Sequence, residues 1–254
     1  MWKVIGSSVT GTSHLAAGRD CEDASAWCAR DGHVFIAVAD GAGSRPMSRH
    51  GAALAVREAI RLTAEAVGDR GADDPAALLA LVVGQVREQV TALASTEGQD
   101  PGDYASTLAV AVLAPESIAI AQVGDTIAVL GRAGHYETLT PEPHGEYVNE
   151  TTFLTGPGPL AEARIAVRPA AGVDGVYLAT DGLRFKILAD LAVSTPFTPF
   201  FDDLTAYARS PAASDDALSR FLTGLDDQSG DDKTLVAAVR ALATPVARPA
   251  RQVP

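Results

Sequence analysis

The chain has 254 residues, of which 47% are hydrophobic and 20% charged, and its formal net charge is −12. This length allows a substantial core and suits one large domain better than two small ones. The negative charge counts against a nucleic-acid partner and an anionic membrane surface, because most of the exterior would repel phosphate polyanions.

Two strands joined by a tight turn are the first predicted elements. Residues 24–30 and 33–39 are apolar, β-rich runs, and Asp31-Gly32 between them is a strong hairpin signal. The second run is apolar almost throughout and ends on Asp40. It is therefore predicted to be a strand buried on both faces, with a carboxylate where the strand stops.

Two long helices are predicted next. In residues 48–67 apolar side chains recur on one face at helical spacing, and the pattern stops at Gly68. The sequence Asp73-Asp74-Pro75 then supplies an N-cap and a first-turn proline, and an apolar stripe runs from Leu79 to Leu93. We expect the two helices to lie side by side over a sheet.

A second block of strands follows in the middle of the chain. Residues 107–113, 117–123 and 126–131 are short apolar runs, separated by Pro115-Glu116 and by Gly124-Asp125. This spacing predicts a meander of antiparallel strands rather than a parallel sheet.

The last third of the chain contains two predicted strands and one predicted helix. Residues 175–180 form a strand that delivers Asp181, residues 213–224 have a helical pattern, and the strand 234–239 follows directly on Asp231-Asp232. Strands and helices thus come in blocks, which predicts an α+β layered architecture with antiparallel sheets.

The ends of the chain and its apolar runs indicate domain limits and location. Residues 1–243 are predicted to form the domain, and the tail 244–254, which contains proline and arginine, is predicted to be disordered. No apolar run approaches the roughly 18–20 residues that cross a bilayer, and the N-terminus lacks the apolar segment of a secretion signal. We therefore expect a cytoplasmic protein without membrane contact, whose Cys21 and Cys28 stay reduced.

The acidic residues that end or precede these strands indicate a metal site. Like charges held close together repel one another unless a cation lies among them, and ligand sets made only of oxygen suit Mg²⁺ or Mn²⁺. Two such ions that share a carboxylate can activate water for in-line attack on phosphorus. Asp40 is the natural shared ligand, because the glycine after it lets the Gly41 carbonyl approach a metal as well.

The motifs occur in an order that resembles a known family. In chain order they are Cys21-Glu22-Asp23-Ala24, Val38-Ala39-Asp40-Gly41-Ala42-Gly43, Ser106-Thr107-Leu108, Val123-Gly124-Asp125-Thr126, Ala179-Thr180-Asp181-Gly182-Leu183 and Asp231-Asp232-Lys233-Thr234-Leu235-Val236. Over about residues 6–240 this order resembles the PP2C (PPM) family of metal-dependent protein serine/threonine phosphatases, of the bacterial type.

The resemblance implies a fold and a metal centre. The family fold is a four-layer α-β-β-α sandwich with two central antiparallel sheets, and its centre holds two Mn²⁺ or Mg²⁺ ions, with a weaker third in bacterial relatives. By resemblance, Asp40 bridges the two ions, and Asp181 with Asp232 completes one site. Glu22 and the Gly41 carbonyl serve the other site.

Further roles follow from the same resemblance. Asp23 would orient metal-bound water, and Asp125 together with Asp181 would hold the third ion. The pair Ser106-Thr107 would support the site structurally.

This chain departs from the family pattern at several positions. The family arginine that clamps the substrate phosphate stands four residues before the first acidic ligand, whereas Arg19 stands three before Glu22. Arg19 is therefore weighed as a phosphate clamp against a plain surface charge. Phe185 takes the place of a further carboxylate, so the third ion is expected to bind weakly or not at all. Ala42 replaces a histidine proposed as general acid in some relatives.

The remaining histidines and one aromatic segment are given simpler interpretations. The five histidines lack metal-ligand spacing and are interpreted as surface or core polar residues, although His14 lies close to the first motif. Residues 194–203 are interpreted as a loop. Its Phe197, Phe200 and Phe201 would either gate the substrate entrance or pack against the body.

Two functions of different classes are considered. The first is a phosphomonoesterase that removes phosphate from phosphoserine and phosphothreonine of proteins by direct attack of a metal-bridged water or hydroxide. Its partner would be the phosphoprotein product of a serine/threonine kinase, and a monomer is expected. The alternative is a pseudophosphatase that binds phosphoproteins with little turnover. A metal-dependent nuclease is disfavoured by the charge of −12.

Overall fold

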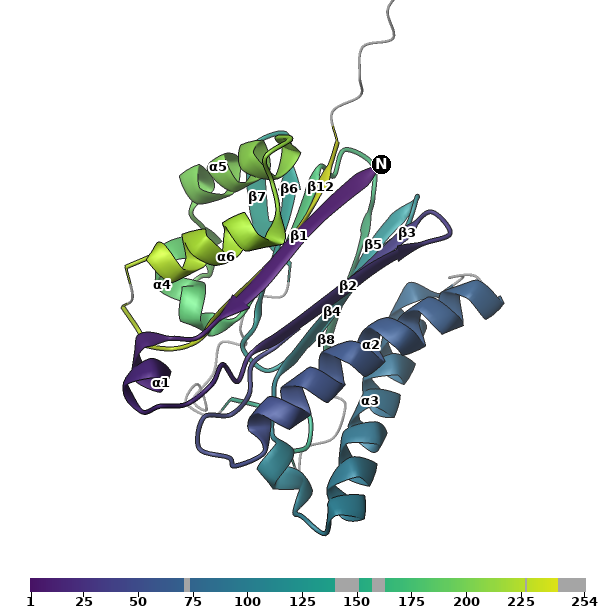
Figure 1. The fold of residues 1–254 in the computed structure, drawn as a ribbon. Helices are drawn as coiled ribbons and strands as arrows, with labels where there is room; N and C mark the ends of the chain where they lie inside the picture. Colours follow the sequence, from purple (N-terminus) through teal and green to yellow (C-terminus); the bar gives the residue numbers. More distant parts are fainter. Residues whose placement is uncertain (71–73, 140–150, 157–162, 227, 242–254) are drawn as a thin grey trace, which may run out of the picture.

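Two five-stranded antiparallel sheets pack face to face, and each carries helices on its outer side (Figure 1). The computed structural model describes residues 1–70, 74–139, 151–156, 163–226 and 228–241. The predicted α+β class and the four-layer α-β-β-α sandwich with two central antiparallel sheets are confirmed. The predicted tail, 244–254, lies outside the described residues.

The first sheet contains the predicted hairpin. Its strands β2 and β3 pair antiparallel from Ala24–Ala39 to Arg30–His33, and Asp31 and Gly32 have positive φ values of 52° and 77°, as such a turn requires. The strand order is β2-β3-β4-β5-β8. The strands are β2 Ala24–Arg30, β3 His33–Ala39, β4 Leu108–Leu113, β5 Ser117–Val123 and β8 Arg164–Pro169.

The second sheet shows where the predicted meander was wrong. After β5 the chain leaves the first sheet, because β6 pairs with β9 and β7 rather than with β5. The crossing occurs at Gly124, whose φ is 92°. The order is β1-β12-β9-β6-β7. The strands are β1 Trp2–Val9, β6 Ile127–Arg132, β7 His135–Thr138, β9 Gly175–Ala179 and β12 Lys233–Arg240.

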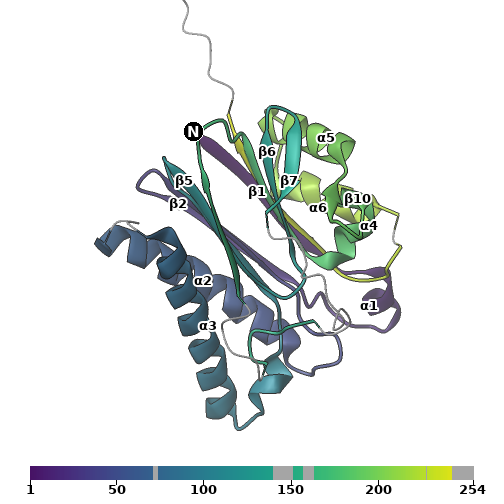
Figure 2. The same cartoon turned by 180° about the vertical axis from the view of Figure 1, so that it is seen from behind.

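Helices α2 (Ser48–Arg70) and α3 (Pro75–Glu97) cover the first sheet, as predicted, although α2 continues past Gly68 (Figure 2). The carboxylate of Asp74 caps α3 by accepting from the Ala76 and Ala77 amides. By length and composition α3 would suffice to cross a membrane, against our expectation for the chain. Core helices meet the same criterion, and the apolar side of α3 packs into the core beneath it.

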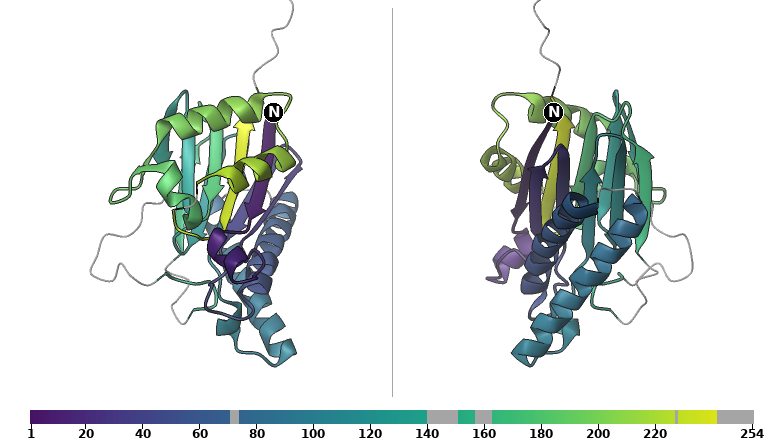
Figure 3. Two further views of the ribbon diagram at one scale, coloured as in Figure 1. Left: turned by 60° about the vertical axis from the view of Figure 1, so that its left-hand side comes forward. Right: turned by 90° about the vertical axis from the view of Figure 1, so that its right-hand side faces the viewer.

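Helices α5 (Thr198–Arg209) and α6 (Asp215–Gly224) cover the second sheet (Figure 3). The loop predicted at 194–203 was wrong, because most of it is the first half of α5, with Pro199 in the first turn. Phe201 is 1% exposed and packs against the ring of Tyr177, with centroids 5.0 Å apart. Phe201 therefore belongs to the core and does not gate the site.

Shorter elements link these layers. Strand β10 (Leu188–Asp190) pairs with β11 (Thr195–Pro196). The other short elements are the helices α1 (Thr12–Ala16) and α4 (Arg184–Ile187) and the 3-10 turns η1 (Pro101–Tyr104) and η3 (Asp181–Leu183). The facing sheets bury an apolar layer that includes Ile36, Val38 and Leu178. β3 and β9 both end at the same end of the sandwich, so Asp40 and Asp181, which follow these strands, meet there. The N-terminus and the end of β12 lie at the opposite end (Figures 1 and 3).

Candidate active site

Asp40 is fixed at the end of β3 by Thr107. The Thr107 amide donates to the Asp40 carbonyl oxygen at 2.8 Å, and the Asp40 amide donates to Thr107 Oγ1 at 2.8 Å. One residue further, Gly41 forms an isolated β-bridge with Ser106. The Ser106-Thr107 pair therefore holds the backbone of Asp40 and Gly41 in place, which is the supporting role that the sequence suggested for it.

The carboxylates of Asp40 and Asp181 lie close together, and most of the charged groups around them are also acidic. Burial is the main cause that raises the pKa of Asp40 well above its usual range, followed by the charges of Asp23, Asp181 and Asp231. Burial and the charge of Asp125 raise the pKa of Asp181 to about 6. Asp181 Oδ1 is buried and accepts no hydrogen bond from the described residues.

This donor set fits a divalent cation. Buried carboxylate oxygens without hydrogen bonds are costly, and a hard cation that binds oxygen would satisfy them. Among the described residues, no three histidine, cysteine or acidic side chains already surround one point. That spacing is expected of carboxylates that repel one another without a cation between them.

Asp23 lies next to this cluster and is buried, with 8% of the residue exposed. Thr180 Oγ1 donates to Asp23 Oδ2 at 2.7 Å, and Thr180 Oγ1 in turn accepts from the Thr234 amide at 3.0 Å. Burial is the main cause that raises the pKa of Asp23 to about 8. A chain of hydrogen bonds thus orients the Asp23 carboxyl from the second sheet.

Asp231, rather than Asp232, faces Asp40 and Asp181. The charge of Asp231 is among the main causes that raise the pKa of both carboxyls, and the charge of Asp232 is not among them. Asp232 is 2% exposed and uses its two oxygens elsewhere, accepting from the Gly11 amide at 2.8 Å and the Glu22 amide at 2.6 Å. Asp231, which also lines the recess described below, is therefore better placed as a metal ligand than the predicted Asp232.

The backbone around the two acidic loops is packed too closely for side chains. A Cβ on Gly182 would lie 1.9 Å from the Asp232 carbonyl oxygen, and a Cβ on Gly41 would lie 2.7 Å from the Glu22 carbonyl oxygen. Glycine at these positions lets the loops that carry Asp181 and Asp40 approach their neighbours.

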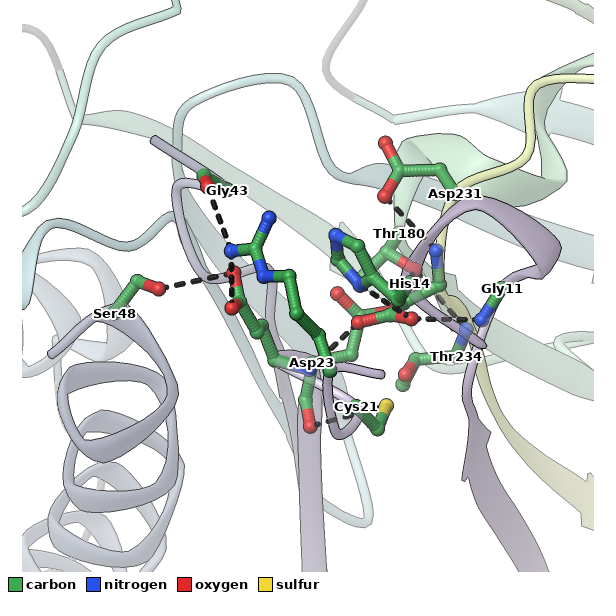
Figure 4. Close-up of polar contacts among 12 residues, drawn as sticks. Gly11, His14, Cys21, Asp23, Gly43, Ser48, Thr180, Asp231 and Thr234 are labelled. Carbon is green, nitrogen blue, oxygen red and sulfur yellow. Dashed lines mark hydrogen bonds and ion pairs between the residues drawn. The ribbon is translucent and has the colours of Figure 1, made fainter. Parts of the chain in front are cut away.

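Glu22 and Arg19 contact Ser48 and Gly43, the two residues labelled on the α2 side of the site in Figure 4. Glu22 Oε2 accepts from Ser48 Oγ at 3.1 Å, and Glu22 Oε1 pairs with Arg19 Nη2. Arg19 Nη2 also donates to the Gly43 carbonyl oxygen at 2.6 Å. Arg19 is therefore brought to the site despite its unusual spacing from Glu22.

A recess of about 250 Å³ opens over these residues. Arg19, Asp40, Gly41 and Asp231 line it together with His14, and its further lining residues are Ser13, Gly43, Ser229 and Gly230. Cationic and anionic side chains thus share one small polar recess.

Asp125 lies near Asp181 at the edge of the cluster, and Phe185 follows Asp181 in α4. Asp125 Oδ2 accepts from Thr151 Oγ1 at 2.9 Å, and its charge raises the pKa of Asp181. Phe185 is 46% exposed and offers no oxygen.

Two functional candidates escaped the sequence reasoning. Asp231 was passed over for its neighbour, although alternation along the following strand puts the two carboxylates on opposite sides. His14 was interpreted as an ordinary polar residue, yet its Nδ1 lies 2.9 Å from Asp232 Oδ1 and its ring lines the recess. Its closeness in sequence to the Glu22 motif was the available signal.

Comparison with known proteins identifies the family. A family model described as protein phosphatase 2C matches residues 10–223. The chain belongs to the protein phosphatase 2C family. PP2C phosphatases are metal-dependent enzymes, in agreement with the donor set described above. The resemblance that the sequence motifs indicated is confirmed, and so is the prediction of a protein phosphatase.

Similar PP2C proteins cover nearly the whole chain. Serine/threonine-protein phosphatase 3 of Escherichia coli (strain K12) is 32% identical over an alignment of 257 positions, which covers 94% of this chain and 99% of that protein. The crystal structure of Stp1, a serine/threonine phosphatase from Staphylococcus aureus, has a TM-score of 0.66 at 17% identity, covering 94% of this chain and 95% of that one. The S. agalactiae serine/threonine phosphatase has a TM-score of 0.62 at 15% identity, covering 94% and 99%.

Proposed function

We propose that this PP2C phosphatase hydrolyses phosphoserine and phosphothreonine on proteins with two divalent cations, Mn²⁺ or Mg²⁺. One observation carries the proposal: Asp40 and Asp231, two carboxylates of the cluster, line the same recess as Arg19. The first suits divalent cations and the second suits a phosphate dianion.

The ligand set follows from the placement of the oxygens. Asp40 would be shared between two ions, with Asp181 and Asp231 on one side and Glu22 and the Gly41 carbonyl on the other. Support comes from the raised pKa values of Asp40 and Asp181. When bound, the ions supply positive charge that lowers the pKa of water and polarises a phosphoryl oxygen.

The protein's own residues would bind and align the reactants. Arg19 uses only Nη2 for Glu22 and Gly43, so its Nη1 and Nε make no hydrogen bond with the described residues and can bind a phosphate oxygen. Thr180 fixes one oxygen of Asp23, which leaves its carboxyl oriented to align an attacking water and accept its proton. A third ion would depend on Asp125 and Asp181 alone, since Phe185 offers no ligand, and is proposed to bind weakly.

The substrate source is proposed from the family, and the absence of polyanionic partners from the charge. With a net charge of −12, the protein would act on phosphoproteins made by a serine/threonine kinase in cytoplasmic signalling, as a monomer without nucleic-acid or membrane partners. A pseudophosphatase is the less favoured candidate, because the carboxylates needed for metal binding are present.

Hydrolysis of p-nitrophenyl phosphate and of a phosphothreonine peptide, measured with and without Mn²⁺, tests the proposal. Turnover should require the ion, and Asp40→Asn and Asp181→Asn should each lower kcat by at least about a thousandfold. Asp226→Asn, on the surface with a side chain 87% exposed, is the matched control. A manganese-saturated wild-type protein that binds the peptide without turnover would establish the pseudophosphatase instead.

A further inference from the structure

His14 is held at the recess by an unusually tight contact between α1 and the loop before β12. The Ser13 amide donates to the Gly230 carbonyl oxygen at 2.9 Å. A Cβ on Gly230 would lie 2.1 Å from Ser13 Oγ, and a Cβ on Gly11 would lie 2.2 Å from the Asp231 backbone. Because both contacts need glycine, the position of His14 relative to Asp231 is fixed by the backbone.

The imidazole of His14 has one nitrogen facing Asp232 and the other facing the recess (Figure 4). Nδ1 lies 2.9 Å from Asp232 Oδ1, an ion-pair distance without the alignment of a linear hydrogen bond. The His14 side chain is 11% exposed. Because Nδ1 makes no hydrogen bond with the described residues, Nε2 can carry the ring proton and donate it into the recess.

Nε2 points to the place where Arg19 also ends. It lies 3.8 Å from the position that a Cβ would take on Gly43, and Arg19 Nη2 donates to the Gly43 carbonyl oxygen at 2.6 Å. Since Gly43 has no side chain, nothing of that residue separates the two donors. Asp40, Asp231 and Glu22 make much of the site anionic, and among the side chains that line the recess Arg19 supplies a cation and His14 an imidazole donor.

We propose that His14, positioned beside Asp232, binds the substrate phosphate together with Arg19, so that an imidazole and a guanidinium both donate hydrogen bonds to the phosphate. This inference rests on the proposed function. A phosphate monoester is a dianion whose oxygens take charge-assisted hydrogen bonds from several directions. Arg19 would bind it as a fork, and His14 would add a single donor from the α1 side.

The test compares His14→Ala and His14→Gln with wild type and with the matched control His135→Ala, an exposed histidine in β7. His14→Ala should raise KM for both p-nitrophenyl phosphate and the phosphothreonine peptide, and Ki for inorganic phosphate, by about tenfold, with kcat within about threefold. His14→Gln should recover part of this affinity, because its amide nitrogen can reach the position of Nε2 and donate.

Three measurements separate this role from others. Calorimetry should give an unchanged Mn²⁺ affinity for His14→Ala, and a loss would make His14 a metal ligand and overturn the proposal. A fall in kcat for the peptide, with p-nitrophenyl phosphate unaffected, would mark a leaving-group acid and also overturn it. Unchanged KM and Ki would show that His14 does not touch phosphate.

A spectroscopic readout on the wild-type protein covers the case in which His14 variants do not fold. With Mg²⁺ present, titration of inorganic phosphate should shift the Nε2 resonance of one histidine, which is assigned to His14 through its own backbone resonances in the wild-type protein, and leave His135 unmoved. A phosphate titration that moves no histidine would overturn the inference. Absence of turnover in the wild type, with the shift present, would overturn only the proposed hydrolytic function.

Discussion

Thr107 and Asp40 are joined by two hydrogen bonds. The Thr107 amide donates to the Asp40 carbonyl oxygen, and the Asp40 amide donates to the Thr107 hydroxyl, each at 2.8 Å. Replacement of that hydroxyl by a methyl group in Thr107→Val leaves the Asp40 amide without its acceptor. We expect the unfolding free energy to fall by about 1–3 kcal/mol and kcat/KM to fall at least about tenfold as Asp40 moves. Denaturant unfolding and steady-state kinetics measure both, and Thr107→Ser, which keeps the hydroxyl, should retain most activity.

Asp231 and Asp232 should behave differently although they are adjacent. Asp231→Asn should lower Mn²⁺ affinity at least about tenfold, because it removes a charge that faces Asp40 and Asp181. Asp232→Asn should mainly lower stability, by about 1–3 kcal/mol, because an amide cannot accept from both the Gly11 and Glu22 amides. Calorimetry with Mn²⁺ and thermal unfolding check this, and equal metal affinities for the two variants would contradict it.

The metal-free protein should lose stability as the pH rises. Folding raises the pKa of Asp181 to about 6 and of Asp23 to about 8, above the roughly 3.9 of an unfolded aspartate. The folded state therefore holds protons that the unfolded state has released. Their stabilisation is complete below about pH 4 and is lost as the pH passes 6 and then 8.

Thermal unfolding between pH 5 and pH 8.5, after removal of metal with EDTA, measures that loss. We expect Tm to fall by about 5 °C or more over this range, and Mn²⁺ to raise Tm more at pH 8.5 than at pH 5. Asp23→Asn should flatten the profile. A Tm that rises with pH in the metal-free protein would refute the assigned cause.

A side chain at Gly182 should destabilise the protein, whereas a side chain at Gly68 should stabilise it. A Cβ at Gly182 would overlap the Asp232 carbonyl oxygen at 1.9 Å, so Gly182→Ala must displace the loop that carries Asp181 or the loop that carries Asp231. We expect a loss of about 1–3 kcal/mol together with weaker Mn²⁺ binding. Gly68 lies in α2 with nothing within 4 Å of an added Cβ, so Gly68→Ala should stabilise by about 0.5–1 kcal/mol. Chemical denaturation compares the two.

Sequence patterns predicted those parts of the fold that local chemistry determines. Asp31-Gly32 determines its hairpin, Asp74 and Pro75 start α3, and a buried strand ends on Asp40 as its composition indicates. The sheet to which β6 belongs could not be predicted, because apolar runs buried on both faces fit either sheet equally. Helix α5 was missed because Pro196 and Pro199 read as loop signals, although Pro199 falls where a helix tolerates it.

The candidate site was predictable in kind but not in each ligand. Carboxylates at strand ends pointed to the cluster of Asp40 and Asp181, since strand ends of facing sheets meet. The choice between Asp231 and Asp232 depends on contacts with Gly11 and Glu22, which are more than 200 residues distant along the chain. His14 likewise gains its partner only when α1 meets the loop before β12.

The placement of the first residue has a practical consequence. β1 runs eight residues from Trp2 before the chain reaches the Gly11 turn, a span of about 26 Å. An affinity tag or fluorescent reporter fused ahead of Met1 would therefore lie at the end of the sandwich opposite the candidate active site. Such a fusion could immobilise the phosphatase on a surface with its substrate entrance facing outward.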